Sequence, residues 1–129
     1  MEAGKKKYIP LKDLEVYRLA RKLSDVSWKI YSQLDYEKKK IMGDQFIRSA
    51  DSVGANIAEG YARYSYLEKV RFYHISRGSL SEAYQHWAEL MIERTVITSE
   101  SFNELEAICK SLEVKLNNFI SSTLKQVKK

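Results

Sequence analysis

The two histidines are the residues whose chemistry points first to a metal site. His74 and His86 are twelve positions apart in one expected helix. At 1.5 Å per residue they are separated by about 18 Å, which is too far for one metal ion. Di-iron bundles need a glutamate and a histidine three positions apart on two helices, whereas Glu82 precedes His86 by four positions and the pattern occurs once. The sequence therefore predicts no metal site.

The single cysteine and the serines show no sign of a nucleophilic site. Cys109 occupies an apolar position in an expected helix, where a small buried side chain is usual, and no partner base is indicated. The serines at 49–52 and 79–81 lack the strand-to-helix elbow of a hydrolase, and no glycine-rich phosphate loop occurs. We therefore predict that the protein is not an enzyme and has no catalytic residues and no cofactor.

Small and charged residues gather in two runs, Asn56–Gly60 and Arg77–Glu82. Glycine inside a helix costs about 0.5–1 kcal/mol relative to alanine, so glycines here favour close packing between helices. Gly54 is the expected point of closest approach.

The charged residues in and near these runs can be placed by assuming that the chain turns back near residue 65. Positions whose numbers add up to about 129 or 130 then lie side by side. This register predicts an ion pair between Arg48 and Glu82 and places Arg77 near residues 51 and 52. A bond between Arg77 and Glu59 would instead cross between subunits, because the two are offset by about 10 Å along the helix axis.

Four long stretches have apolar residues three and four positions apart, which predicts four helices. Ser65 with Glu68 marks the start of the third helix, and Thr98 or Ser99 marks the start of the fourth. Short turns make an all-α, up-down-up-down antiparallel four-helix bundle the expected fold. The expected helices cover about 12–34, 39–63, 66–95 and 99–124, between a flexible basic arm at 1–11 and a basic tail at 125–129.

The formal net charge of +5 comes from the ends of the chain. Residues 8–124 contain 16 basic and 16 acidic side chains, whereas the two end segments contain six lysines and one glutamate. This excess favours weak, salt-sensitive contacts with phosphate. One cysteine, no apolar run of transmembrane length and no signal peptide predict a soluble, cytoplasmic protein without a membrane partner.

Aromatic residues are numerous, and nine of them are tyrosines. Tyr66, Tyr73, Tyr84 and Trp87 fall in the regular apolar row of the third helix, which also includes Arg77. Aromatic residues at helical spacing are typical of a core or a subunit contact, and stacking on nucleobases is the alternative.

The segments 45–50, Asn56–Gly60 and Arg77–Glu82, with Phe72, resemble the pattern of the bacterial four-helix-bundle proteins called 23S rRNA-intervening-sequence proteins. The resemblance covers about residues 12–121 and implies a homopentameric ring. It extends to the accessory proteins of diversity-generating retroelements, pentamers that bind a reverse transcriptase and RNA. The residues that match the motif, none of them implied to be catalytic, are Arg48, Asn56, Glu59, Gly60, Arg77, Gly78 and Glu82.

Two functions follow as hypotheses. The first is an oligomer that binds RNA or a nucleoprotein partner, such as a reverse transcriptase, through phosphate contacts that do not read sequence. The second is a structural scaffold or protein adaptor that does not bind nucleic acid. Catalysis in a pocket is a third alternative and would require a titrating group with a shifted pKa. The candidate phosphate contacts are Lys38, Lys39, Lys40, Arg63, Lys69 and Arg71.

Overall fold

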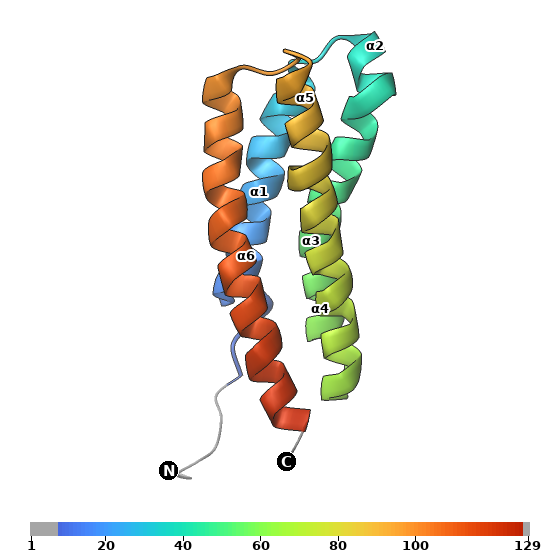
Figure 1. Cartoon of the computed structure of the whole chain (residues 1–129). Coiled ribbons are helices and arrows are strands. Elements are labelled where there is room, and N and C mark those ends of the chain that lie inside the picture. Colours follow the sequence, from blue (N-terminus) through green and yellow to red (C-terminus); the bar gives the residue numbers. More distant parts are fainter. Residues whose placement is uncertain (1–7, 128–129) are drawn as a thin grey trace.

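Four helical rods lie side by side in the computed structural model, which describes residues 8–127 (Figure 1). The chain reverses direction after each rod, and every regular element between residues 8 and 127 is helical. The all-α four-helix bundle predicted from the sequence is confirmed. The first rod consists of η1 (Leu11–Asp13) and α1 (Glu15–Ser32). The second consists of α2 (Tyr36–Lys38), η2 (Lys39–Gly43) and α3 (Asp44–Tyr61). The third consists of α4 (Tyr66–Ser81), η3 (Glu82–Ala88) and α5 (Glu89–Glu93), and the fourth is α6 (Ser99–Val127).

Side-chain caps fix where three of the rods begin. Asp35 accepts a hydrogen bond from the Lys38 amide at 2.9 Å, and Ser65 accepts one from the Glu68 amide at 3.1 Å. Thr98 Oγ1 likewise accepts from the amide of Ser101 at 3.1 Å. The second rod therefore begins at Tyr36, three residues before the predicted start at 39, because the charged segment that suggested a turn is itself capped and helical.

The apolar rows of the four rods meet in one core. α3 packs against α1 and α4, and α6 packs against α4 and α1. The Tyr73 ring is 1% exposed and lies 4.7 Å from the Phe119 ring of α6. The large side chains that are fully buried include Phe46, Leu23, Ile57, Met91, Leu105, Leu112, Leu116 and Val53.

Both ends of the described chain lie at the same end of the bundle as the turn between α3 and α4, here called the lower end (Figure 1). α6 continues to Val127, so Lys125 is helical and only Lys128 and Lys129 of the expected tail lie outside the described residues. Residues 1–7 of the expected arm also lie outside them. Residues 8–10 are held against α3, since Tyr61 donates a hydrogen bond to the Ile9 carbonyl at 2.6 Å and its ring stacks on Tyr8.

The length and composition of the helices bear on whether any of them could cross a membrane. Between Tyr8 and Val127, none combines the length and the apolar character needed to span a bilayer.

Candidate nucleic-acid interface

The six candidate phosphate contacts do not form one surface. Lys38, Lys39 and Lys40 lie on α2 and η2, at the upper end of the bundle (Figure 1). Arg63, Lys69 and Arg71 flank the turn between α3 and α4 at the lower end. About 35 Å of helix separates Lys40 from Arg63. The two groups must therefore be considered separately.

Acidic residues gather towards the upper end. Residues 82–106 contain six glutamates and a single arginine, and they form η3, α5 and the first turns of α6. Around the α3–α4 turn and the end of α6 the balance is reversed, because the four cations Arg63, Lys69, Arg71 and Lys125 outnumber the two carboxylates Glu59 and Glu68. In the sequence, three further lysines directly precede Tyr8 and two directly follow Val127. A polyanion is therefore attracted more strongly to the lower end than to the upper end.

Two arginines at the lower end are held in place by one aromatic ring. The guanidinium groups of Arg63 and Arg71 each lie 4.7 Å from the centre of the Phe72 ring. Arg63 also pairs with Glu59 at 2.7 Å and with Glu68 at 3.9 Å. Both arginines remain more than 40% exposed. Because a guanidinium has five donors, these contacts leave N–H groups free for phosphate oxygens.

Lys69 has a structural role that the sequence did not suggest. Its Nζ donates a hydrogen bond to the carbonyl of Tyr61 at 2.7 Å, at the C-terminal end of α3. The same ammonium group lies 5.2 Å from the centre of the Tyr61 ring. Partial burial lowers the pKa of Lys69. This lysine neutralises the negative end of the α3 dipole and is poorly placed for a phosphate.

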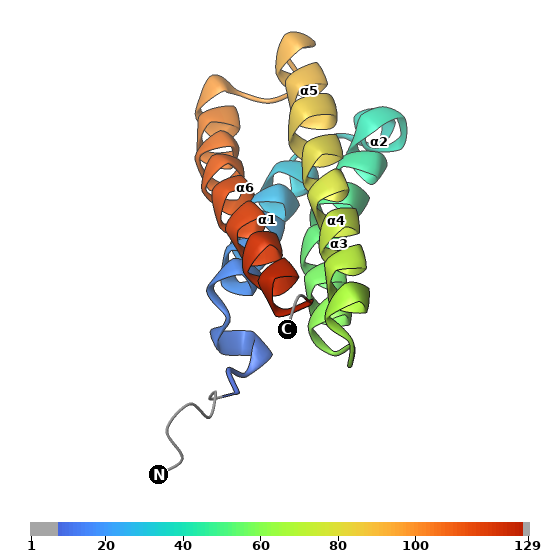
Figure 2. The same ribbon diagram turned by 60° about the horizontal axis from the view of Figure 1, so that its bottom comes forward.

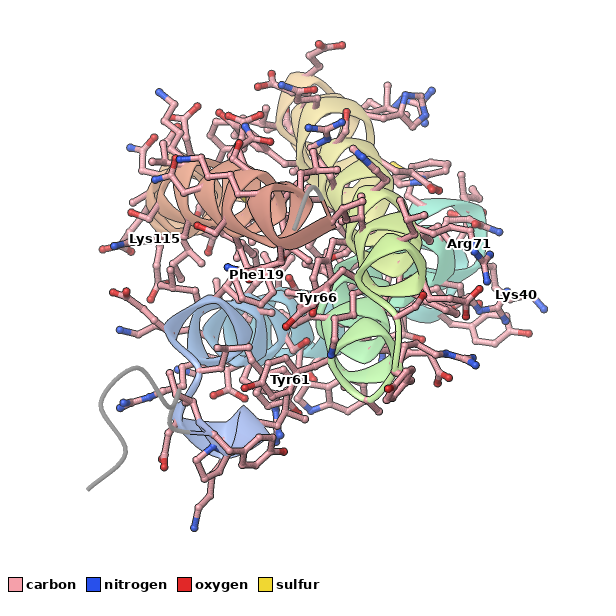
Figure 3. All side chains as sticks on the ribbon, turned by 90° about the horizontal axis from the view of Figure 1, so that it is seen from below. Lys40, Tyr61, Tyr66, Arg71, Lys115 and Phe119 are labelled. Carbon is pink, nitrogen blue, oxygen red and sulfur yellow. The ribbon has the colours of Figure 1, made fainter. Side chains whose placement is uncertain are left out.

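Aromatic side chains line a groove of about 740 Å³ at the lower end. The groove lies between the α3–α4 turn and the last residues of α6, whose end comes forward in Figure 2. Tyr64 is fully exposed, and Tyr66 and Leu67 are 42% and 64% exposed. Tyr66 was expected in the apolar row of its helix, but it is the first residue of α4 and has no helical turn before it to cover its ring. Figure 3 shows Tyr61 and Tyr66 from below, with Phe119 deeper between the rods.

Gly60, and not Gly54, lies where α3 and α4 approach each other closely. A Cβ atom on Gly60 would lie 2.8 Å from Phe72 Cβ and 3.1 Å from the Lys69 carbonyl oxygen. On Gly54 it would lie 3.4 Å from the Ala20 methyl group of α1, an ordinary contact. Gly78 has no atom within 4 Å of that position and is exposed, so tight packing within the chain does not explain it.

Most of the other motif residues lie on the outer surface of α3 and η3. Arg48, Glu59 and Glu82 are exposed, and Asn56 is half-buried. The Asn56 amide donates to the Ser52 carbonyl and hydroxyl oxygens, both at 2.9 Å. Ser79 Oγ on α4 donates to the same Ser52 hydroxyl at 3.0 Å, which joins the two helices. These residues are therefore available to a neighbouring molecule.

The predicted ion pair between Arg48 and Glu82 is wrong. No such contact joins these two residues, although both are described. The indole N–H of Trp87 donates to Glu82 at 3.2 Å. The charge of Arg48 acts instead on Tyr31 of α1. The pKa of Tyr31 is raised by its 2.7 Å hydrogen bond to Asp44, and Arg48 partly opposes this effect.

The predicted neighbours of Arg77 are also wrong, although the predicted register is correct. Ser76 Oγ donates to the Val53 carbonyl at 2.8 Å, as expected for a turn near residue 65. Arg77 is one position further around the helix and points to α6, where it donates to Asn117 Oδ1 at 3.0 Å. A second guanidinium nitrogen lies 3.0 Å from His74 Nδ1. The predicted level of Arg77 along the helix axis is therefore correct, whereas the predicted direction of its side chain around that axis is wrong.

Cys109 lies in the core beside a groove of about 370 Å³ between the third rod and α6. Burial raises the pKa of its thiol to about 12, so it is protonated and a poor nucleophile near neutral pH. Within residues 8–127, no group of three or more histidine, cysteine, aspartate and glutamate side chains could bind a metal ion.

Comparisons with known proteins place these observations in a family. The family described as 23S rRNA-intervening sequence protein matches residues 12–118. A crystal structure of a protein of unknown function from the S23 ribosomal protein family of Bacteroides thetaiotaomicron is similar, with 25% sequence identity and a TM-score of 0.77. The similarity covers 83% of this chain and 96% of that one. A search of curated proteins found no match. Because the family match spans most of the sequence and all four rods, the chain belongs to the 23S rRNA-intervening sequence protein family.

Proposed function

We infer that this protein is a non-enzymatic oligomer that binds RNA, alone or in a nucleoprotein, through the lower end of its bundle. The observation behind this inference is the uneven distribution of charge: Lys125 and the arginines of the α3–α4 turn lie at one end, where the described chain starts and stops next to further lysines in the sequence, and six glutamates lie towards the other. RNA attracted to the lower end would make phosphate contacts with Arg63 and Arg71. Lys38, Lys39 and Lys40 would contribute less, because they share their end with the acidic segment.

Self-association is the second part of the proposal. Arg48 and Glu59 on α3 and Glu82 on η3 put both signs of charge on the exposed surface of the second and third rods, and Ile75 of α4 is 43% exposed. A surface with both charges and an apolar residue can pair with a copy of itself. The homopentamer implied by the family resemblance is the assembly that we propose, in the cytoplasm. In it, Arg77 and Glu59 would be candidates for a contact between subunits.

A protein adaptor without nucleic-acid binding is the alternative function. Trp28 of α1 and Ile41 of η2, each 58% exposed, favour it, because these apolar side chains lie outside the basic residues of the lower end. A protein partner docked there would bury apolar surface and depend little on salt.

A titration of structured RNA at two salt concentrations separates the two functions. RNA binding through the lower end predicts an affinity that falls as salt increases, because bound cations release counterions from the phosphates. Fluorescence anisotropy with a labelled RNA hairpin measures this directly. No binding, or binding that does not depend on salt, would contradict the proposal and leave the adaptor.

A further inference from the structure

We propose that Tyr64 and Tyr66 stack on unpaired nucleobases, so that the lower end prefers single-stranded RNA to a duplex. The inference rests on the proposed function and specifies its ligand. It starts from the groove between the α3–α4 turn and the end of α6, where Arg63 and Lys69 accompany the tyrosines.

The backbone that carries the two rings is held by hydrogen bonds on both sides. The amide of Arg63 donates to the Gly60 carbonyl at 3.0 Å, which closes the end of α3 just before Tyr64. Ser65 lies between the tyrosines and caps α4 through the Glu68 amide at 3.1 Å. A turn held on both sides loses little backbone freedom when a base stacks on it.

The rings are exposed where nothing in the bundle requires aromatic side chains. Tyr64 is 101% exposed, and no hydrogen bond or ring contact within residues 8–127 involves its side chain. Tyr66 is 42% exposed and lines the same groove. The Tyr64 ring in solvent contributes nothing to the core, Tyr66 keeps part of its ring accessible, and every base presents a flat face on which such rings can stack.

The charges next to the rings select the partner. Arg63 and Arg71 are held on the Phe72 ring at 4.7 Å each, within a few residues of both tyrosines. Cations beside exposed aromatic rings form the combination by which proteins bind single strands, with phosphate contacts next to stacked bases. In a duplex the base faces are already stacked on one another, so only unpaired nucleotides could use the tyrosines.

Exposed Tyr36 is the matched control. It is 75% exposed and has a cation, Lys40, 5.5 Å from its ring centre, yet it lies at the upper end of the bundle. If any exposed tyrosine with a neighbouring cation bound RNA, Tyr36 would contribute as much as Tyr64.

The experiment compares the affinities for a labelled single-stranded RNA and for a duplex of the same length. We expect the double variant Tyr64→Ala and Tyr66→Ala to bind the single strand about ten-fold more weakly, with less than about two-fold change for the duplex. The double variant Tyr64→Phe and Tyr66→Phe, which keeps both rings, should retain wild-type affinity. Tyr36→Ala should leave both affinities unchanged.

Three results would overturn the inference: no loss for the single strand, an equal loss for the duplex, or a change in solution mass, which would make the tyrosines subunit contacts. The proposed function is judged on the wild type in the same titration. Absence of salt-dependent binding by the wild type would overturn both, whereas wild-type binding that survives in the alanine variant would overturn only the stacking.

Discussion

Gly60 and Gly54 lie on the same helix but differ in the space that their neighbours leave. At Gly60 a methyl group would meet Phe72, Tyr73 and the backbone of Lys69, all at 3.1 Å or less. At Gly54 it would meet only the Ala20 methyl group at 3.4 Å and Tyr17 at 3.8 Å. The distance between α3 and α4 therefore depends on Gly60 having no side chain.

The two alanine substitutions should change stability in opposite directions. Gly60→Ala must push α3 and α4 apart, and we expect the free energy of unfolding to fall by about 1–3 kcal/mol. Gly54→Ala adds an ordinary contact and removes a helix-interior glycine, so a gain of about 0.5–1 kcal/mol is expected.

Urea denaturation of both variants at one protein concentration gives this comparison. If Gly60→Ala is as stable as the wild type, the close contact with Phe72 and Tyr73 does not exist.

The turn between α5 and α6 depends on one unfavourable backbone conformation. Thr95 has φ of 57°, in the left-handed region that suits glycine and disfavours a β-branched residue. The Val96 amide donates to the Met91 carbonyl at 2.8 Å, and the Thr95 amide donates to that of Ile92 at 3.1 Å. These bonds form a Schellman motif, which usually has glycine at the position of Thr95.

Thr95→Gly should therefore stabilise the protein, by about 0.5–1 kcal/mol. Thr98→Gly is the matched control in the same turn. It removes the hydroxyl group that accepts from Ser101 and should cost a few tenths of a kcal/mol. Thermal denaturation measures the stability of both variants. A change in the same direction for both would contradict the account.

Local signals in the sequence predict where helices lie along the chain better than they predict the direction in which a side chain points around the helix axis. Apolar spacing and the Ser65 and Thr98 caps located the helices, and the turn near residue 65 gave the correct level of Ser76 beside Val53. The side of a helix on which a residue lies depends on rotation about the helix axis, which packing of the whole core decides. For this reason the neighbours predicted for Arg77 and Arg48 were wrong.

The candidate site could be predicted only in part. Arg63 and Arg71 follow from their position beside a turn, but the role of Lys69 depends on a carbonyl eight residues away that only the fold brings close. The acidic segment at 82–106 is visible in the sequence. Its separation from Arg63, Arg71 and Lys125 requires the topology, because a bundle with different connections would bring the two together.

At the scale of the whole molecule, a substitution at Gly78 tests whether the protein self-associates through the outer surface of α4. Because the space beside it is open, a glutamate at this position fits a single chain but would place a charge in any contact on the outer surface of α4. We expect Gly78→Glu to lower the solution mass while helix content is retained. Ala107→Glu, at an exposed position on α6, should leave the mass unchanged. Light scattering after gel filtration measures both, and an unchanged mass for Gly78→Glu would place the contact elsewhere.

RNA binding at the lower end is the central claim. The most direct test compares a variant that loses basic charge at the lower end with one that loses it at the upper end. The measurement is the slope of log affinity against log salt for one single-stranded RNA. Neutralising Arg63 and Arg71 with glutamine should reduce that slope by about 1–1.5, since each phosphate contact contributes about 0.7. Neutralising Lys39 and Lys40 in the same way should reduce the slope much less. The reverse pattern, with the slope carried by the upper lysines, would contradict the account.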